Sequence, residues 1–93
     1  MPLTQNVTFQ GVLEKGNRVQ IPKLILWQFK IETDQVLKVG VNARESYRGW
    51  QFFYAKMDKQ GRILVPKLTL SVMAREENQI FVGQVLEVIL QPA

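Results

Sequence analysis

The chain contains a duplicated segment, and this duplication constrains the fold more than any other feature of the sequence. Residues 7–26 return as residues 51–70, with matching positions 44 apart. The returning residues include Arg18, Pro22, Lys23, Leu24 and Leu26 in the first copy, and Arg62, Pro66, Lys67, Leu68 and Leu70 in the second. Because 93 residues can bury one modest core but not two, we expect both copies to share a single domain over residues 1–93.

Each copy has the pattern of two strands, a short helix and a third strand. Apolar residues alternate with polar ones in the first copy over residues 7–13, 19–21 and 37–41, which is typical of half-buried strands. Gly16 and Asn17 accept the positive φ of a tight hairpin turn, and the spacing of apolar residues predicts a helix over 23–30. The second copy repeats this order. The side chains expected to face the core are Val7, Phe9, Gly11, Leu13, Val19, Ile21, Leu37, Val39 and Val41 in the first copy, and Phe53, Ala55, Met57, Ile63, Val65, Leu86, Val88 and Leu90 in the second.

Two such units, each with unpaired strand edges, can satisfy those edges by pairing with each other. We therefore predict a mostly β fold: a six-stranded, pseudo-two-fold symmetric closed barrel built from two β-β-α-β repeats with two short helices. The first repeat covers about 6–41, a linker covers 42–49, and the second repeat covers about 50–91. The offset between copies grows from 44 to 49 after the second helix, which places an exposed inserted loop around 74–82. A barrel completed within one chain is expected to be a monomer.

Composition argues against an enzyme. The chain has no cysteine and no histidine, which excludes disulfides, thiolate zinc sites, cysteine nucleophiles and imidazole bases. The pair Glu76 and Glu77 has no third ligand nearby in the sequence to make a metal site, so it is expected to be a solvated loop pair. We expect no cofactor, no metal and no catalytic residue. The sequence also lacks a membrane-length apolar run and a signal peptide pattern, which favours a cytoplasmic protein without membrane contact.

Two short motifs carry a resemblance to a known superfamily. Residues 61–66, Gly-Arg-Ile-Leu-Val-Pro, precede the second helix, and residues 16–22 form a looser copy with one extra residue between glycine and arginine. This pattern resembles the AbrB / SpoVT / MazE-like superfamily of cradle-loop barrels. Residues 83–88 are similar to the glycine-aspartate box of those barrels, with Gln84 in place of the aspartate. Because AbrB-like proteins usually carry one unit and dimerise, the single-chain RIFT-type barrel is the better match.

The resemblance implies DNA binding through arginines of the hairpin turn and of the first helical turn. Arg18 and Arg62 stand at the turn positions, but the helix positions hold Leu26-Trp27 and Leu70-Ser71 rather than arginines. A net charge of +4 and a pI near 9.7 also favour a polyanionic partner. The candidate nucleic-acid-binding residues are Lys15, Arg18, Lys23, Lys59, Arg62 and Lys67, with Arg44 and Arg48 from the linker. The competing interpretation, that these are ordinary solvated charges, carries the greater weight at this point.

A second candidate surface occurs only in the second copy. Trp50, Phe52 and Tyr54 alternate with the inward residues, so they share the outward strand face with Lys56. These rings suit protein association or base stacking. The alternative is that the linker or a terminus packs across them, which we weigh slightly higher because large exposed aromatic patches are uncommon on monomers. The sequence thus predicts a small non-enzymatic binding module, with nucleic acid as the first partner and a protein as the second.

Overall fold

The computed structural model describes residues 3, 5–43, 49–74 and 80–93. The order of elements is the one that the duplication predicts, with two strands, a helix and a strand in each copy. The elements are β1 (Val7–Glu14), β2 (Arg18–Gln20), α1 (Lys23–Gln28), β3 (Leu37–Ala43), β4 (Gln51–Ala55), β5 (Arg62–Leu64), α2 (Lys67–Met73) and β6 (Val85–Pro92). The predicted inserted loop falls mainly on residues 75–79, which lie outside the described residues.

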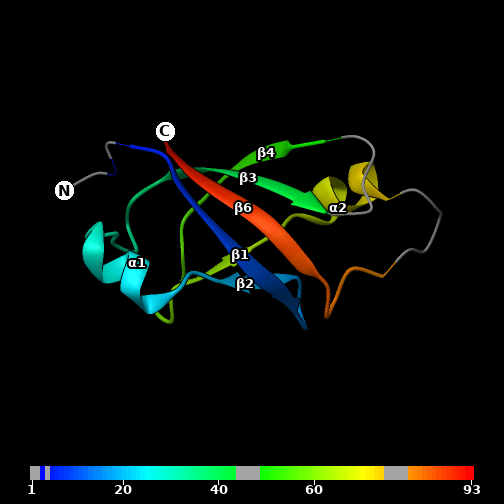
Figure 1. The fold of residues 1–93 in the computed structure, drawn as a ribbon, viewed down its shortest axis with the longest axis horizontal. Helices are drawn as coiled ribbons and strands as arrows, with labels where there is room; N and C mark the ends of the chain where they lie inside the picture. Colours follow the sequence, from blue (N-terminus) through cyan, green and yellow to red (C-terminus); the bar gives the residue numbers. More distant parts are fainter. Residues whose placement is uncertain (1–2, 4, 44–48, 75–79) are drawn as a thin grey trace.

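All six strands form one antiparallel sheet in the order β4-β3-β6-β1-β2-β5. β6 of the second copy lies between β1 and β3 of the first, and β2 pairs with β5, so the copies are interleaved. The sheet curls into a half-barrel, and the two helices lie at opposite ends of its long axis (Figure 1). Among the described residues no ladder joins the edge strands β4 and β5, and α2 packs beside β4. The mostly β fold is confirmed, whereas the closed barrel remains a prediction.

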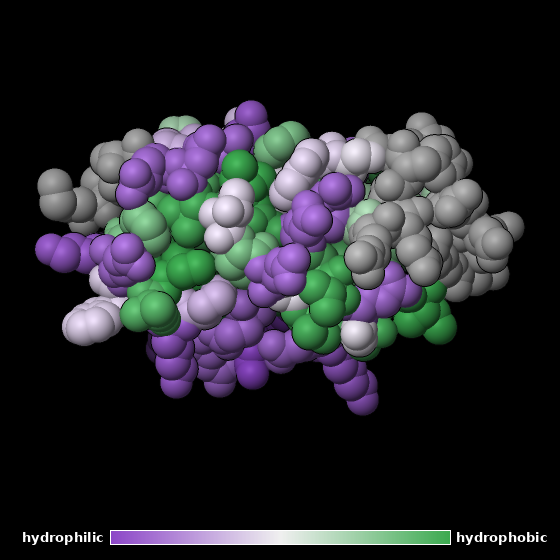
Figure 2. Space-filling model, viewed as in Figure 1, coloured by the Kyte–Doolittle hydropathy of each residue, from purple (hydrophilic) through white to green (hydrophobic). Residues whose placement is uncertain are grey.

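The core fills the concave side of the sheet and draws on both copies. The side chains that are almost completely buried are Leu13, Val19, Ile21, Leu37, Val39 and Val41 from the first copy, and Ile63, Val65, Met73, Leu86, Val88 and Leu90 from the second. No polar or charged residue is buried in the part of the chain that the structure describes. On the face shown in Figure 2, hydrophobic side chains appear in separate areas with hydrophilic side chains between them. The predicted inward positions are therefore confirmed for these strands.

Helix α1 ends at Gln28, two residues before the predicted end at Lys30. Lys30 adopts a left-handed conformation with φ 53°, and the backbone N–H of Ile31 donates to the carbonyl oxygen of Leu26 at 3.1 Å. This is the hydrogen bond of a Schellman motif, which terminates a helix with a left-handed residue. Burial of Ile31 beside the end of the helix favours this termination. Both described helices, of six and seven residues, are too short to cross a membrane.

The two hairpin turns differ in conformation but keep one register. Gly16 and Asn17 both have positive φ, as predicted, while in the second turn Gly61 has a φ of 80°. Asn17 and Gly61 are matching positions of the two copies, so an asparagine supplies in one turn the conformation that a glycine supplies in the other. The strands that follow the two turns, β2 and β5, pair with each other, and Val19 lies opposite its matching residue Ile63. At the other end of the first repeat, β3 extends to Ala43, two residues beyond the predicted end of the repeat at Val41.

Candidate nucleic-acid interface

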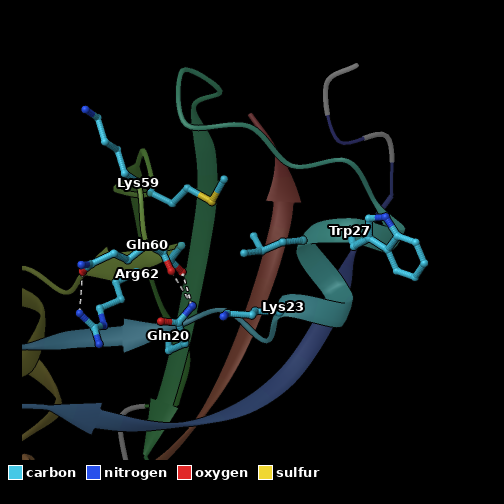
Figure 3. Close-up of a pocket in the computed structure, with 9 residues that line it drawn as sticks. Gln20, Lys23, Trp27, Lys59, Gln60 and Arg62 are labelled. Carbon is cyan, nitrogen blue, oxygen red and sulfur yellow. Dashed lines mark hydrogen bonds between the residues drawn. The ribbon is translucent and has the colours of Figure 1, made fainter.

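An open groove of about 650 Å³ lies between α1 and the turn that connects β4 to β5 (Figure 3). Its lining comes from β2 and α1 of the first copy and from the turn and β5 of the second. The lining residues are Gln20, Lys23, Leu26, Trp27, Met57, Lys59, Gln60, Gly61 and Arg62. The groove is therefore a product of the interleaved fold, since neither copy supplies it alone.

The floor of the groove depends on a close approach between α1 and the turn. A Cβ atom on Gly61 would lie 2.6 Å from Leu26 Cδ1, so only glycine allows this contact. Gln20, at the end of β2, joins the chain that leads into α1 to the turn, because its Nε2 donates to the carbonyl oxygens of Ile21 and Gln60, each at 2.9 Å. The bond to Gln60 holds the end of β2 against the turn at the side of the groove.

Three cationic side chains line the groove, and its lining contains no carboxylate. Lys23 comes from the start of α1 and Lys59 from the turn, and both side chains are exposed. Neither lysine forms an ion pair with any described residue. Figure 3 shows Lys23 extended toward Gln20. Figure 3 shows Lys59 extended away from Lys23, so the two ammonium groups lie apart, and their attraction for an anion is weakened by salt because both are open to solvent.

Trp27 lies on α1 at the rim of this groove and is 80% exposed. The sequence analysis noted it only as a residue that occupies an expected arginine position. The signal that could have identified it is the comparison between copies, since the matching position holds Ser71 and the shared core does not require an indole there. Figure 3 shows the ring on the side of α1 that faces away from Lys59 and Arg62, and a flat, exposed ring of this kind is suited to stacking on a base.

Both arginines of the duplicated motif approach carboxylates of the other copy. Arg62 Nε lies 3.4 Å from Glu14 Oε1, and Arg18 Nη1 lies 4.0 Å from Asp58 Oδ2. The Arg62 contact is an ion pair without a hydrogen bond, since Nε is buried and has no hydrogen-bond partner among the described residues. Arg62 Nη1 donates to Gln60 Oε1 at 2.7 Å. The arginines therefore bridge the two copies, and they are partly compensated as anion ligands.

Asp58 organises the turn that carries Lys59. Its Oδ1 accepts backbone hydrogen bonds from Gln60 at 2.8 Å and from Arg62 at 3.0 Å. The hydrogen bond from the Arg62 backbone is the main reason why the pKa of Asp58 lies below its ordinary value, with smaller contributions from the Gln60 backbone and from the positive charges of Arg18 and Arg62. Partial desolvation opposes this shift. The carboxylate is thus ionised at neutral pH and holds the turn in place.

The structure groups the predicted cations across the copies rather than within them. Lys23 of the first copy shares the groove with Lys59 and Arg62 of the second. Lys15 and Lys67 are exposed but do not line this groove. Arg44 and Arg48 lie outside the described residues. Nowhere in the described ranges do three or more acidic side chains gather closely enough to hold a metal ion.

The predicted aromatic surface is on β4, an edge strand. Trp50, Phe52 and Tyr54 are 39%, 47% and 66% exposed, which does not fit the interpretation that the chain packs across all three rings. The cation at these rings is Lys38 of β3, whose Nζ lies 5.1 Å from the centre of the Phe52 ring. Lys56, which the sequence analysis placed on this face, is exposed. Sequence reasoning missed Lys38 because its proximity depends on pairing between strands.

The comparisons with known proteins establish a fold likeness. No protein-family model matches this chain, and a search of curated proteins finds no match. The solution structure of PHS018 from Pyrococcus horikoshii superposes with a TM-score of 0.79, covering 99% of this chain and 92% of that chain at 22% sequence identity. At this identity the likeness shows a shared fold and carries no function.

Proposed function

We propose that this protein binds single-stranded nucleic acid in the groove between α1 and the β4–β5 turn. The observation that supports the proposal is the lining of the groove, which includes Lys23, Lys59 and Arg62 and no carboxylate, with the exposed ring of Trp27 at its rim. A single strand of nucleic acid presents charged phosphates and unpaired bases, and this groove offers a partner for each.

The two lysines would contact phosphates, and Trp27 would stack on one unpaired base. Stacking on an aromatic side chain contributes about 1 to 3 kcal/mol per base. A duplex has no free base face to offer to the ring, so we expect single strands to bind more tightly than duplexes. Because only a few cations meet the backbone, binding should be weak and strongly dependent on salt.

The test is a titration of fluorescently labelled oligothymidine at several salt concentrations. The double variant Lys23→Ala/Lys59→Ala should lower the magnitude of the slope of log affinity against log salt by about 1.4, since each phosphate contact on a single strand contributes about 0.7. Lys56→Ala removes an exposed lysine outside the groove and serves as the matched control. Trp27→Ala should weaken binding roughly tenfold, whereas Trp27→Phe should retain part of the affinity.

Undetectable binding at low ionic strength would reject the proposal, as would an affinity that does not change with salt. A slope lowered equally by Lys56→Ala would also count against it, because the charge effect would then be general. Arg18→Ala with Arg62→Ala should flatten the slope less than the lysine variant does, since each arginine already has a carboxylate nearby.

A second candidate function is association with a protein through the outward face of β4. It is favoured by the exposure of Phe52 and Tyr54 on an edge strand. A protein partner that wild type retains should then not be retained by the Tyr54→Ser variant. The Val12→Ser variant, which alters the outward face of β1, should still retain it. Equal retention by wild type and Tyr54→Ser would reject this candidate.

We also propose that the chain is a single-chain relative of the AbrB-like cradle-loop barrels. Two pairings support this proposal: Val19 faces Ile63, and Gly40 faces Ile89, and in each case the partners are matching positions of the two copies. A two-fold axis through both pairings would relate the copies, and a β4–β5 ladder would close the barrel. Nuclear Overhauser contacts between β4 and β5 in solution test this directly, and their absence would leave an open half-barrel.

A further inference from the structure

A second cavity, of about 320 Å³, lies on the outward side of the sheet where β1 pairs with β6. Its lining consists of Thr8, Phe9, Gln10, Trp50, Glu87 and Val88. The nucleic-acid proposal does not involve this cavity, and it shares no lining residue with the groove at α1. The charged residue in its lining is a carboxylate, whereas the charged residues that line the groove at α1 are cations.

Glu87 is the only charged residue in this lining. Its side chain is exposed, and it forms no ion pair with any described residue. Gln10 lies directly opposite Glu87 on β1, and Asn42 lies directly opposite it on β3. Asn42 Oδ1 is buried and has no hydrogen-bond partner among the described residues. Gln10 and Asn42 therefore flank Glu87 in one row of the sheet, and of these two only Gln10 lines the cavity.

Trp50 supplies an aromatic wall to the same cavity and is 39% exposed. An indole ring is the best aromatic partner for a cation, and an ammonium or alkylated ammonium group held beside an aromatic face is attracted by the ring quadrupole. A carboxylate next to the ring adds a charge-assisted contact. A tryptophan and a carboxylate, with the polar side chains of Thr8 and Gln10 beside them, fit a ligand that is positively charged and partly apolar.

We propose that this cavity binds an organic ammonium cation, with Trp50 against its alkyl groups and Glu87 as its counter-ion. The cation could be a free amine or the side chain of a lysine in another protein, and both share the same recognition chemistry. The proposal goes beyond nucleic-acid binding and is independent of it, since the Glu87 carboxylate would repel a phosphate.

The test compares choline with 3,3-dimethyl-1-butanol, which has the same shape without the charge. Trp27→Phe leaves Trp50 as the only tryptophan, since the chain has two. In this background, choline should shift the backbone amide signals of Thr8, Gln10 and Glu87 and the indole N–H signal of Trp50. The neutral compound should bind roughly tenfold more weakly or not at all. Acetyl-lysine methylamide, compared with acetyl-norleucine methylamide, tests the side-chain source.

Glu87→Gln should weaken choline binding several-fold, whereas Glu32→Gln, which alters an exposed carboxylate outside the cavity, should not. Trp50→Leu should abolish binding, and if that variant fails to fold, Glu87→Gln on the exposed face still decides the matter. Equal binding of the neutral compound, signal changes confined to other residues, or no saturable binding at about 0.1 M choline would each overturn the proposal. Loss of oligothymidine binding in Lys23→Ala/Lys59→Ala with choline binding intact would show that the two sites are separate.

Discussion

Gly61 illustrates how one residue sets the shape of the proposed nucleic-acid groove. It has a φ of 80°, and a Cβ atom at this position would meet Leu26 Cδ1 at 2.6 Å and Gln20 Nε2 at 3.0 Å. Two demands therefore coincide: a left-handed backbone conformation and the absence of a side chain. Gly16, in the other turn, meets only the first demand, since its φ is 88° and nothing lies within 4 Å of its hypothetical Cβ.

Comparison of Gly61→Ala with Gly16→Ala separates the two demands. Gly16→Ala should lower the free energy of unfolding by about 1 kcal/mol, the cost of a left-handed alanine. Gly61→Ala should lower it somewhat further, because the end of the Leu26 side chain must also move away from the new Cβ atom. Urea unfolding with an unchanged m-value measures both. Equal losses would show that the helix moves away from the turn without resistance.

Asp58 makes the stability of its turn depend on pH. Its pKa in the folded protein lies below the ordinary value of 3.8. The contribution is therefore fully present above that value and is lost as the pH falls through the lowered pKa. Asp58→Asn keeps an oxygen that can accept the two backbone hydrogen bonds but lacks the charge. We expect the variant to be less stable than wild type at pH 7 and about equally stable below pH 2 (~2 units under the ordinary pKa), as measured by thermal unfolding across pH.

The residues of the site were only partly predictable from the sequence. The positive φ of Gly16 and Asn17 followed from local chemistry, and Lys23, Lys59 and Arg62 were predicted as individual cations. Their assembly was not predicted, because it depends on β2 pairing with β5 and so on contacts between the copies. The carboxylates beside the arginines were missed for the same reason.

At the scale of the elements, β3 and β4 fit together through a missing side chain. Gly40 of β3 lies opposite Phe52 of β4, and a Cβ on Gly40 would lie 2.6 Å from both the Phe52 ring and Ile89 Cγ2. The Phe52 ring lies against the backbone of Gly40, in the space that a Cβ atom would otherwise occupy, and Lys38 lies over the same ring. The alternation of residues predicted which face Phe52 occupies, but not this contact, since the register between β3 and β4 cannot be derived from either strand alone.

Gly40→Ala should therefore lower the free energy of unfolding by about 2 kcal/mol through overpacking. Phe52→Ala in the Gly40→Ala background should recover part of this loss, because one of the two obstructing groups is removed. A double-mutant cycle with the single Phe52→Ala variant isolates the coupling. Additive effects of the two substitutions would contradict the contact.

The end of α1 shows a limit of prediction at this scale. The spacing of Leu26 and Phe29 favoured a helix reaching Lys30, and local propensity does not oppose it. The helix stops at Gln28 because burial of Ile31 and its hydrogen bond to Leu26 draw the chain away from the helix axis. Burial in the shared core is a tertiary effect, so the sequence of the helix alone does not contain it.

At the scale of the molecule, the duplication predicted the order of elements and the single core, whereas the barrel closure that it also predicts would need a β4–β5 ladder, which is not found among the described residues. Two identical patterns favour a symmetric solution, whereas α2 packs beside β4 in the structure. The second copy is five residues longer than the first, and the extra residues lie near α2 in the sequence, around 74–82. The copies thus differ in length close to the helix that packs beside β4.

Neither half should fold alone. β6 pairs with both β1 and β3, so a fragment of residues 1–46 would lose the strand at the centre of its sheet, and a fragment of residues 47–93 would lose both neighbours of β6. We expect each fragment to lack β structure by circular dichroism and the mixture to regain it. A fragment with cooperative unfolding on its own would contradict a core shared between the copies.

The pairing of β1 with β6 also governs how the protein responds to a pull on its ends. Val7 lies opposite Leu90, and both termini leave the sheet at the same end (Figure 1). Tension between the termini would load this ladder at one end, so its hydrogen bonds would break one pair after another instead of all at the same time. We therefore expect low mechanical resistance along this axis, so that a protease or translocase pulling on an end would begin at the central strands.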